Sequence, residues 1–415
     1  MATVTKSIGT DGRDYSTISG WEADLDDTAI YASGDDAVGE CYNDSEFDES
    51  VTIDGGGDVG LNSITLTVPE GERHDGTAGT GMRIVETQSI SHPINLDSYN
   101  GPPRWVEWLE IDMNGYQGTY GIVEHRKRTN YPGEGVGHCL LHDSVGKATN
   151  GIRSINSSSG SYINNICYDI VQDESFKDTC GISSDGPYDT KELYNNTIFN
   201  IEDNTSDDCF GIEFGDSADV YLKNCVACDV GGSTSGSIAC YNKSSPANAN
   251  ADYDASSDGT APGANSLTNI VTADQFVSTT DGSEDLHLKS GADCIDAGAD
   301  LGTTPEGVNI DIDGRDRDAQ GDTWDIGADE YVSAVPVLTP APMAAQTSME
   351  QTSITQTHNL QPAPMVSLSG VDQTTLQQLH GVVPAQMLAG VDLEQSGITQ
   401  AHTLSPDPMR ALTEL

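Results

Sequence analysis

Leu140-Leu141-His142-Asp143 and Ile166-Cys167-Tyr168-Asp169 are two copies of one short pattern, in which apolar residues lead to an acidic side chain. Related strings end at Asp112, Asn200 and Asp229, so the acidic or amide position recurs at nearly even intervals along the chain. Strings of this length and composition are typical of short β-strands, and the segments between them leave no room for a long helix. The recurrence indicates one strand repeated in every coil of a larger structure.

A second repeat lies between these strings. Gly-Ile recurs at constant spacing, at Gly121-Ile122, Gly151-Ile152, Gly181-Ile182 and Gly211-Ile212. Adjacent Asn residues, such as Asn164-Asn165, suit the bends because Asn tolerates a left-handed backbone. Strands that pair from coil to coil build a solenoid that rises ~4.8 Å per coil. We therefore predict an all-β fold, a right-handed single-stranded parallel β-helix over residues 31–285.

Composition excludes several kinds of partner. The 415 residues carry a formal net charge of -48, which repels nucleic-acid phosphates and anionic membranes. No run approaches the ~18 apolar residues that span a bilayer. We expect no nucleic-acid partner and no membrane insertion. The segment Met1–Lys6 lacks a signal-peptide pattern, which favours synthesis in the host cytoplasm. The nine cysteines mostly occupy strand-like positions, and we interpret them as small buried apolar side chains.

Both ends of the predicted solenoid carry signals of their own. Residues 1–30 contain Tyr15-x-Thr17-Ile18-x-x-Trp21, a pattern that favours a short amphipathic helix. Such a helix would cap the first coil and cover a sheet edge that is otherwise prone to aggregation. We therefore expect residues 1–30 to form an N-terminal cap.

The repeated strands resemble those of right-handed parallel β-helix proteins, a superfamily of pectate-lyase-like enzymes and phage spike or adhesin proteins. Leu286–Gly298, Asp311–Arg315 and Trp324–Tyr331 are similar to the terminal segment of bacterial and phage β-helix proteins of the choice-of-anchor type. Two positions depart from that pattern, because Ser-Gly-Ala-Asp replaces Ser-Pro and Ala-Asp-Glu-Tyr replaces Ala-Tyr-Glu-Tyr. The resemblance implies that residues 286–332 form the terminal coil or cap of the β-helix.

The acidic strand ends are the candidate catalytic residues. In register, Asp112, Asp143, Asp169, Asn200 and Asp229 stack as a column, one per coil. Carboxylates about 5 Å apart match a retaining glycosidase, and wider pairs match an inverting one. Asp143, Asp169 and Asp229 are therefore candidates for polysaccharide hydrolysis. The alternative is that these are ordinary polar turn positions in an acidic chain.

A cluster of aromatic and basic residues is a candidate glycan-binding surface. Guanidinium groups beside aromatic faces could hold an anionic glycan. The alternative is that Trp108 belongs to the core and that the basic residues form a solvated loop. The candidates are Trp105, Trp108, Tyr116, Tyr120, Arg126, Lys127, Arg128 and Tyr131.

One acidic loop has the spacing of a metal site. Asp311, Asp313, Asp316 and Asp318 surround Gly314, and alternating carboxylates along such a turn suit Ca²⁺. Arg315 and Arg317 could pair with these acids instead. Ca²⁺ is the one cofactor that the sequence suggests.

The C-terminal segment contains a repeat with a period of about 22 residues, in the range of small repeat units. Leu338, Leu360, Val382 and Leu404 share this spacing, as do Pro, Met, Gln and His positions. No single copy can bury its own apolar face, so the copies stack on each other, on sister chains or on another protein. We expect a linker and first degenerate repeat at 333–345, then a β-rich, extended tail at 346–415. The candidate docking or oligomerisation residues are Ile354, His358, Leu360, Met365, Leu376, His380, Met387, Ile398, His402, Leu404 and Met409.

Together these features favour a structural role over a catalytic one. The expected protein is a phage or phage-like virion component, either a spike, a fibre or a capsid-surface decoration. Its β-helix would face outward on the virion surface and bind a host-surface glycan. Its tail would contact other virion proteins or sister chains, with a homo-oligomer such as a trimer as the expected state. The alternatives are a polysaccharide depolymerase (a hydrolase or a lyase) and a cell-surface adhesin.

Overall fold

The computed structural model describes residues 2–333, except for 98–100, 117–119, 127–132, 148, 156–158, 175–176, 185–189, 215–218, 233–234, 244–247 and 322. Met1–Val332 form one compact unit of the chain. The predicted C-terminal repeats, with every docking candidate from Ile354 to Met409, lie outside the described residues.

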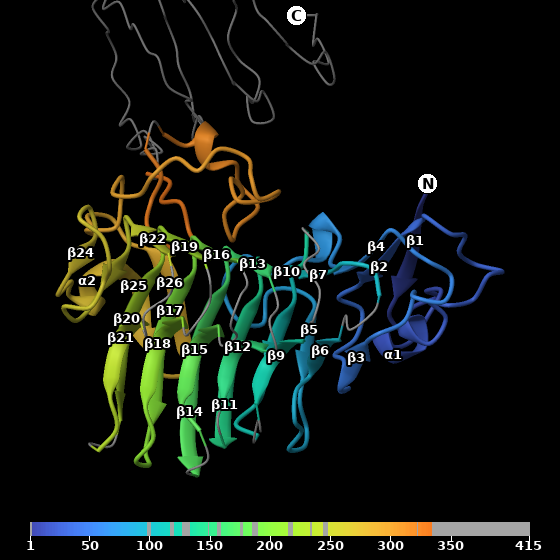
Figure 1. Cartoon of the computed structure of the whole chain (residues 1–415), viewed down its shortest axis with the longest axis horizontal. Coiled ribbons are helices and arrows are strands. Elements are labelled where there is room, and N and C mark those ends of the chain that lie inside the picture. Colours follow the sequence, from blue (N-terminus) through green and yellow to red (C-terminus); the bar gives the residue numbers. More distant parts are fainter. Residues whose placement is uncertain are drawn as a thin grey trace, which may run out of the picture. The chain divides into compact units, whose positions relative to one another are not determined.

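Three parallel sheets wind around one core (Figure 1). Sheet A contains β1 (Thr3–Ile8), β2 (Asp36–Cys41), β4 (Ser63–Thr67), β7 (Arg104–Glu107), β10 (Gly135–Gly137), β13 (Gly160–Ile163), β16 (Thr190–Tyr194), β19 (Asp219–Lys223) and β22 (Asn248–Asp252). Sheet B contains β5 (Arg83–Val85), β8 (Glu110–Asp112), β11 (Leu140–Lys147), β14 (Ile166–Glu174), β17 (Thr197–Asp203), β20 (Val226–Gly232), β23 (Ala255–Ser256) and β24 (Leu267–Thr268).

Sheet C completes each coil with β3 (Val51–Ile53), β6 (Ile94–Asp97), β9 (Gly121–Arg126), β12 (Asn150–Ile155), β15 (Thr179–Ser184), β18 (Cys209–Phe214) and β21 (Ile238–Lys243). The chain visits the sheets in turn, so each strand pairs with its counterpart one coil away (Figure 1). The result is a parallel β-solenoid of about eight turns, and the predicted β-helix fold is confirmed.

Asn residues make the bend between sheets A and B. Asn164, Asn195 and Asn224 hold left-handed backbone angles, with φ of 54°, 54° and 57°. The Asn224 side-chain amide donates to Asn195 Oδ1 at 3.0 Å, and Asn165 donates to Asn196 Oδ1 at the same distance. All of these side chains are buried, so the ladder satisfies polar groups that water cannot reach. The sequence-based prediction of Asn bends is confirmed.

Apolar side chains of matching rungs fill the interior. The inward row of sheet B consists of Ile111, Leu141, Cys167, Ile198 and Ala227, all fully buried and paired in register. All nine cysteines are free and buried, which confirms their interpretation as core residues.

The N-terminal helix forms where the sequence predicts it. In α1 (Ile18–Glu22), Thr17 caps the first turn by accepting a hydrogen bond from the Gly20 backbone, and Trp21 is buried. The expectation that all of residues 1–30 form a cap was too broad. Strand β1 pairs in parallel with β2 and is the first strand of sheet A.

The other helices of the described residues are also short. They are α2 (Thr272–Gln275) and the 3-10 turns η1 (Glu70–Glu72) and η2 (Arg317–Ala319). Within the described part of the chain, no helix has the length and apolar character needed to cross a membrane.

The segment after β24 does not continue the solenoid, so the β-helix ends before the predicted boundary at residue 285. Of the two forms expected for 286–332, a terminal coil or a cap, the terminal coil is wrong. An antiparallel hairpin of β25 (Phe276–Thr280) and β26 (Ser283–Leu288) follows α2. This hairpin packs on the outer face of sheet B, where Leu286 and Ile326 join Leu140 and Phe199 in one apolar cluster. Between Leu286 and Ile326 in the chain, Val308 and Trp324 pack with Ile163 and Tyr194 of sheet A. The outer face of sheet B is itself apolar, so burying it favours a chain that folds back along the side.

Candidate functional site

Four acidic or amide residues form the predicted column on sheet B. Asp143, Asp169, Asn200 and Asp229 have φ of 57°, 52°, 51° and 52°. The register pairs the residues on either side of them, so the four occupy consecutive rungs. Asp and Asn adopt this left-handed conformation more readily than other residues with a Cβ, because their short polar side chains bond locally.

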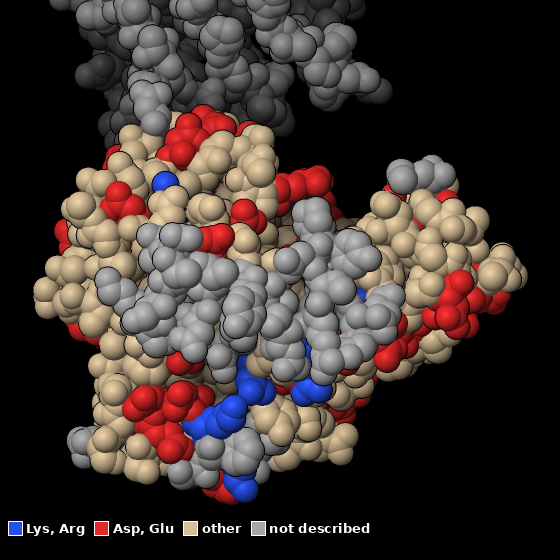
Figure 2. All heavy atoms as spheres, in the orientation of Figure 1, with Lys and Arg blue, Asp and Glu red and all other residues tan. Residues whose placement is uncertain are grey.

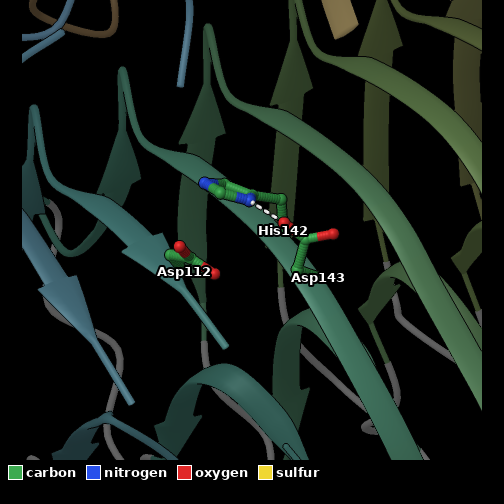
Figure 3. A group of neighbouring side chains, drawn as sticks. All are labelled: Asp112, His142 and Asp143. Carbon is green, nitrogen blue, oxygen red and sulfur yellow. Dashed lines mark hydrogen bonds and ion pairs between the residues drawn. The ribbon is translucent and has the colours of Figure 1, made fainter. Parts of the chain in front are cut away.

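Asp112 does not belong to the column, contrary to the expectation. It pairs with His142, one position before Asp143. A one-residue offset in a strand turns a side chain to the other face or moves it along the sheet. Asp112 therefore lies beside the imidazole of His142 instead of below Asp143, as Figure 3 shows.

His142 joins two carboxylates at this end of the column. Its Nδ1 lies 2.9 Å from Asp143 Oδ2, and its Nε2 lies 3.4 Å from Glu110 Oε1 (Figure 3 shows the first contact). Its ring stacks on Tyr168 with the ring centres 4.9 Å apart. Burial alone would lower the pKa of His142, but the bonds to Asp143 and Glu110 outweigh it and raise that pKa to about 9. The group is an imidazolium at neutral pH.

A backbone N–H holds the Glu110 carboxylate in place. Its side chain is fully buried, and both carboxylate oxygens accept from the Gly79 backbone N–H, at 2.8 and 2.9 Å. Burial raises the pKa of the neighbouring Asp112, with Asp143 and Glu110 adding to the effect. Asp112, His142 and Asp143 offer ligand atoms within 4.8 Å of one another.

A second group of carboxylates lies one rung further. Asp169, Asp281 and Glu284 place an oxygen each within 4.8 Å of one another. Asp169 comes from β14, whereas Asp281 lies in the turn of the β25–β26 hairpin and Glu284 on β26. The Asn200 amide donates to Asp169 Oδ1 at 2.6 Å. Burial raises the pKa of Asp169 to about 7, although the Asn200 bond acts in the opposite direction.

Asp229, the third catalytic candidate, stands apart from these groups. Asn200 separates it from Asp169 along the column. Its side chain is exposed, and its Oδ1 accepts from the Thr272 hydroxyl at 2.6 Å. The structure thus brings Asp143 and Asp169 to adjacent rungs and leaves Asp229 outside the pair.

The glycan-binding candidates that the structure describes do not gather on one surface. Trp105 is half-buried on β7 of sheet A, and its Nε1 donates to Glu107 at 2.9 Å. Trp108 is 3% exposed and stacks on His138 with ring centres 4.2 Å apart, so its proposed role in glycan contact is wrong. It belongs to the core and occupies the bend position that Asn164 and Asn195 take in later coils, with a left-handed φ of 63°.

The other described glycan-binding candidates lie on different parts of the chain. Tyr116 is 37% exposed, Tyr120 lies under the Arg153 guanidinium, and Arg126 at the end of β9 pairs with Glu124. Lys127, Arg128 and Tyr131 are outside the described residues.

The acidic loop proposed for Ca²⁺ is held by protein groups instead. Asp311 accepts from the backbone N–H of Asp313 and Arg315, and Asp313 pairs with the Arg315 side chain. Asp316 caps η2, and Asp318 accepts from Trp324 Nε1 at 2.8 Å. The four carboxylates face different partners and do not converge, which corrects the calcium expectation. Arginine pairing, the stated alternative, holds for Asp313.

Sequence reasoning missed the third convergent group of the described residues. His287 Nδ1 lies 2.6 Å from Asp285 Oδ1, and its Nε2 lies 3.1 Å from Asp313 Oδ1, with Asp329 close by. Burial would lower the pKa of His287, but bonding to Asp313 outweighs it and raises that pKa to about 10. The available signal was the alternation of apolar and polar residues around Leu286-His287-Leu288, which predicts a half-buried strand.

Comparisons with known proteins identify no relatives by sequence. No model of a protein family matches the chain, and no curated protein matches it. Among solved structures, the crystal structure of the pectate lyase Pel9A matches at 13% identity, with 80% of this chain and 96% of that chain covered. The TM-score of that superposition is 0.22, which is too low to support any argument about function.

Proposed function

We propose that this chain is a phage or phage-like virion protein, a spike, fibre or capsid-surface decoration, whose β-helix binds a glycan along the column on sheet B. In this proposal the repeat tail docks the protein to the particle or joins sister chains. The link to a virion comes from the repeat tail together with the solenoid body, and it is an analogy of architecture.

One observation carries the glycan-binding part. The column places hydrogen-bond acceptors on consecutive rungs. Three of its four members, Asp143, Asn200 and Asp229, are at least partly exposed, and the fourth, Asp169, is 8% exposed. Carboxylates and amides bind hydroxyl donors, and a regular row of them suits a chain of sugars. Because the column is acidic, a neutral or amino-sugar glycan fits it better than a polyuronate.

A glycan array probed with the purified chain tests this proposal. Wild type is expected to bind a subset of neutral or amino-sugar glycans, and Asp143→Ala should weaken that binding at least tenfold. Glu70→Ala, an exposed acidic residue far along the chain from the column, is the matched control for the loss of one charge. Unchanged binding by Asp143→Ala, or equal losses in both variants, would exclude the column as the site.

A second function, hydrolysis of the bound glycan, is favoured by the raised pKa of one carboxyl of the column, Asp169. The raised pKa of Asp169, about 7, leaves a proton that it can donate to a glycosidic oxygen. Asp143 lies one rung away, and strands one rung apart are separated by about 4.8 Å. Retaining glycosidases place their two carboxyls about 5–5.5 Å apart, so adjacent rungs suit that mechanism. In that mechanism Asp143 attacks the anomeric carbon, and Asp169 then activates the water that releases the sugar.

Reducing-end release separates binding from hydrolysis. On a glycan that the chain binds, a hydrolase should release reducing ends, and Asp169→Asn should abolish release while retaining binding. Absence of release by wild type leaves a binding protein and rejects the hydrolase.

The tail has a separate test. Deletion of 346–415 is expected to leave glycan binding intact and to prevent incorporation into particles. A tail-deleted chain that still assembles into particles would contradict the docking role.

A further inference from the structure

The three convergent groups differ in how their negative charge is balanced. Asp112 and Asp143 flank the His142 imidazolium, and Asp313 and Asp329 surround His287. Each of these groups therefore contains its own cation. The remaining group, Asp169, Asp281 and Glu284, consists only of carboxylates.

Two of those carboxylates are buried, and each has one oxygen without a donor among the described residues. Asp169 and Glu284 are each 8% exposed. Among the described residues, Asp169 Oδ2 and Glu284 Oε1 have no hydrogen-bond partner. The Asn200 amide donates to the other oxygen of Asp169, Oδ1. A buried carboxylate oxygen without a partner is costly, and two of them within one cluster of carboxylates are more so. The arrangement requires a cation or a shared proton, and the side chains described around it supply no cation.

We propose that Asp169, Asp281 and Glu284 bind a hard divalent cation, Ca²⁺ in the first place, that fastens the β25–β26 hairpin to sheet B. Oxygen-only ligands are those that Ca²⁺ prefers, and it accepts irregular geometry with six to eight ligands. Asp281 is exposed, so water completes the coordination from the solvent side.

The site joins segments that are distant in the chain. Asp169 belongs to a coil of the solenoid, and the other two ligands belong to the segment that covers it. The ion would therefore add to the apolar contacts of Leu286 and Phe276 with the outer face of sheet B. This inference does not depend on glycan binding, and it competes with the hydrolase, because a cation on Asp169 displaces the proton that hydrolysis requires.

Calorimetric titration of the full chain tests the site. Protein is treated with EDTA, freed of chelator and titrated with CaCl₂, with MgCl₂ and NaCl as comparison salts at equal ionic strength. We expect one Ca²⁺ site in the range of about 10⁻⁵ to 10⁻³ M and a melting temperature that rises with Ca²⁺. Glu284→Gln and Asp169→Asn should each weaken Ca²⁺ binding at least tenfold.

Asp229→Asn is the matched control, because it neutralises a carboxylate of the same column outside the group. It should bind Ca²⁺ like wild type. In EDTA, Glu284→Gln should melt at or above the wild-type temperature, since one unpaired charge is removed, which also shows that this variant folds. Failure of Ca²⁺ to bind wild type, or binding that survives in Glu284→Gln, would overturn the proposal. A proton shared between Asp169 and Glu284 would then be the explanation.

Discussion

Asp143, Asp169, Asn200 and Asp229 stand in the column because of a backbone requirement and a side-chain capability together. Each has a positive φ, a conformation that costs most residues with a Cβ about 1–2 kcal/mol. Asp and Asn reduce that cost, and the same side chains then present acceptors to the surface. A purely structural demand thus produces a row of polar groups that a ligand can use.

Asn200 separates the two contributions. Asn200→Gly and Asn200→Ala both remove the hydrogen bond to Asp169. Only alanine has a Cβ, which makes the left-handed backbone at φ 51° unfavourable. We expect Asn200→Ala to be less stable than Asn200→Gly by about 1 kcal/mol in urea unfolding. Equal stability of the two variants would show that the left-handed backbone is not a constraint at this position.

His287 should make stability depend on pH in the alkaline range. Its pKa is about 10 in the folded chain, above the ordinary value of 6.5. The stabilisation is therefore complete below about pH 6.5 and is lost as pH rises toward 10. We expect unfolding free energy to fall by roughly 2–4 kcal/mol between pH 7 and 10 from this group, and His287→Gln to flatten that decline. If the unfolding free energy of His287→Gln fell just as much, other groups would cause the decline. His142, whose pKa is also raised, would be the first candidate.

Spacing alone predicted the column, because a nearly even interval brings Asp143, Asp169, Asn200 and Asp229 to the same place in successive coils. It did not predict Glu284 or His287 in the convergent groups. Those residues arrive from a segment that runs back along the solenoid, and no repeat in the sequence encodes that path. The prediction for Asp112 was wrong because the interval between the repeated strings varies from coil to coil. Such an interval cannot reveal an offset of one position.

Elements of the fold were predictable where local signals decide them. The Thr17 cap and the buried Ile18 and Trp21 mark α1 in the sequence. Residues 286–332 were expected to form a terminal coil or cap, although the sequence contained a signal that sheet B needs a covering layer. Strings such as Ile166-Cys167-Tyr168 are apolar at successive positions, and strands apolar on both faces are buried on both faces. Sheet B therefore needed a second layer, which the β25–β26 hairpin and the following residues provide.

Adjacent residues of β25 test this covering layer. Phe276 is 2% exposed on the outer face of sheet B, and Val277 is 55% exposed. Phe276→Ala should lower the free energy of unfolding by about 3–4 kcal/mol through the cavity it leaves. Val277→Ala should change it by less than about 0.5 kcal/mol. If denaturant unfolding showed small and similar losses of stability for Phe276→Ala and Val277→Ala, the hairpin would not pack on the sheet.

Negative charge dominates the molecule as a whole. Acidic side chains are spread over several elements of the face shown in Figure 2, where basic ones are few. With a net charge of -48, self-repulsion opposes the folded state, and salt screens it. We expect the melting temperature to rise between about 0.02 and 0.5 M NaCl, measured with EDTA present so that divalent binding is excluded. A temperature that falls with salt would indicate that attractive ion pairs dominate.

Architecture was the most predictable level, since a parallel solenoid follows from one strand pattern repeated at a nearly regular interval. The biological setting is the least predictable, because a β-helix serves enzymes and binding proteins alike. The virion assignment and the docking tail therefore stand as proposals for assembly experiments.

Hydrogen–deuterium exchange of the full chain, with and without a glycan selected from the array, tests the central claim that the sheet B column is the binding surface. We predict slower exchange in peptides covering β11, β14 and β17, and no change in β9 and β12 of sheet C. Protection confined to sheet C or sheet A, with the sheet B peptides unaffected, would contradict the claim.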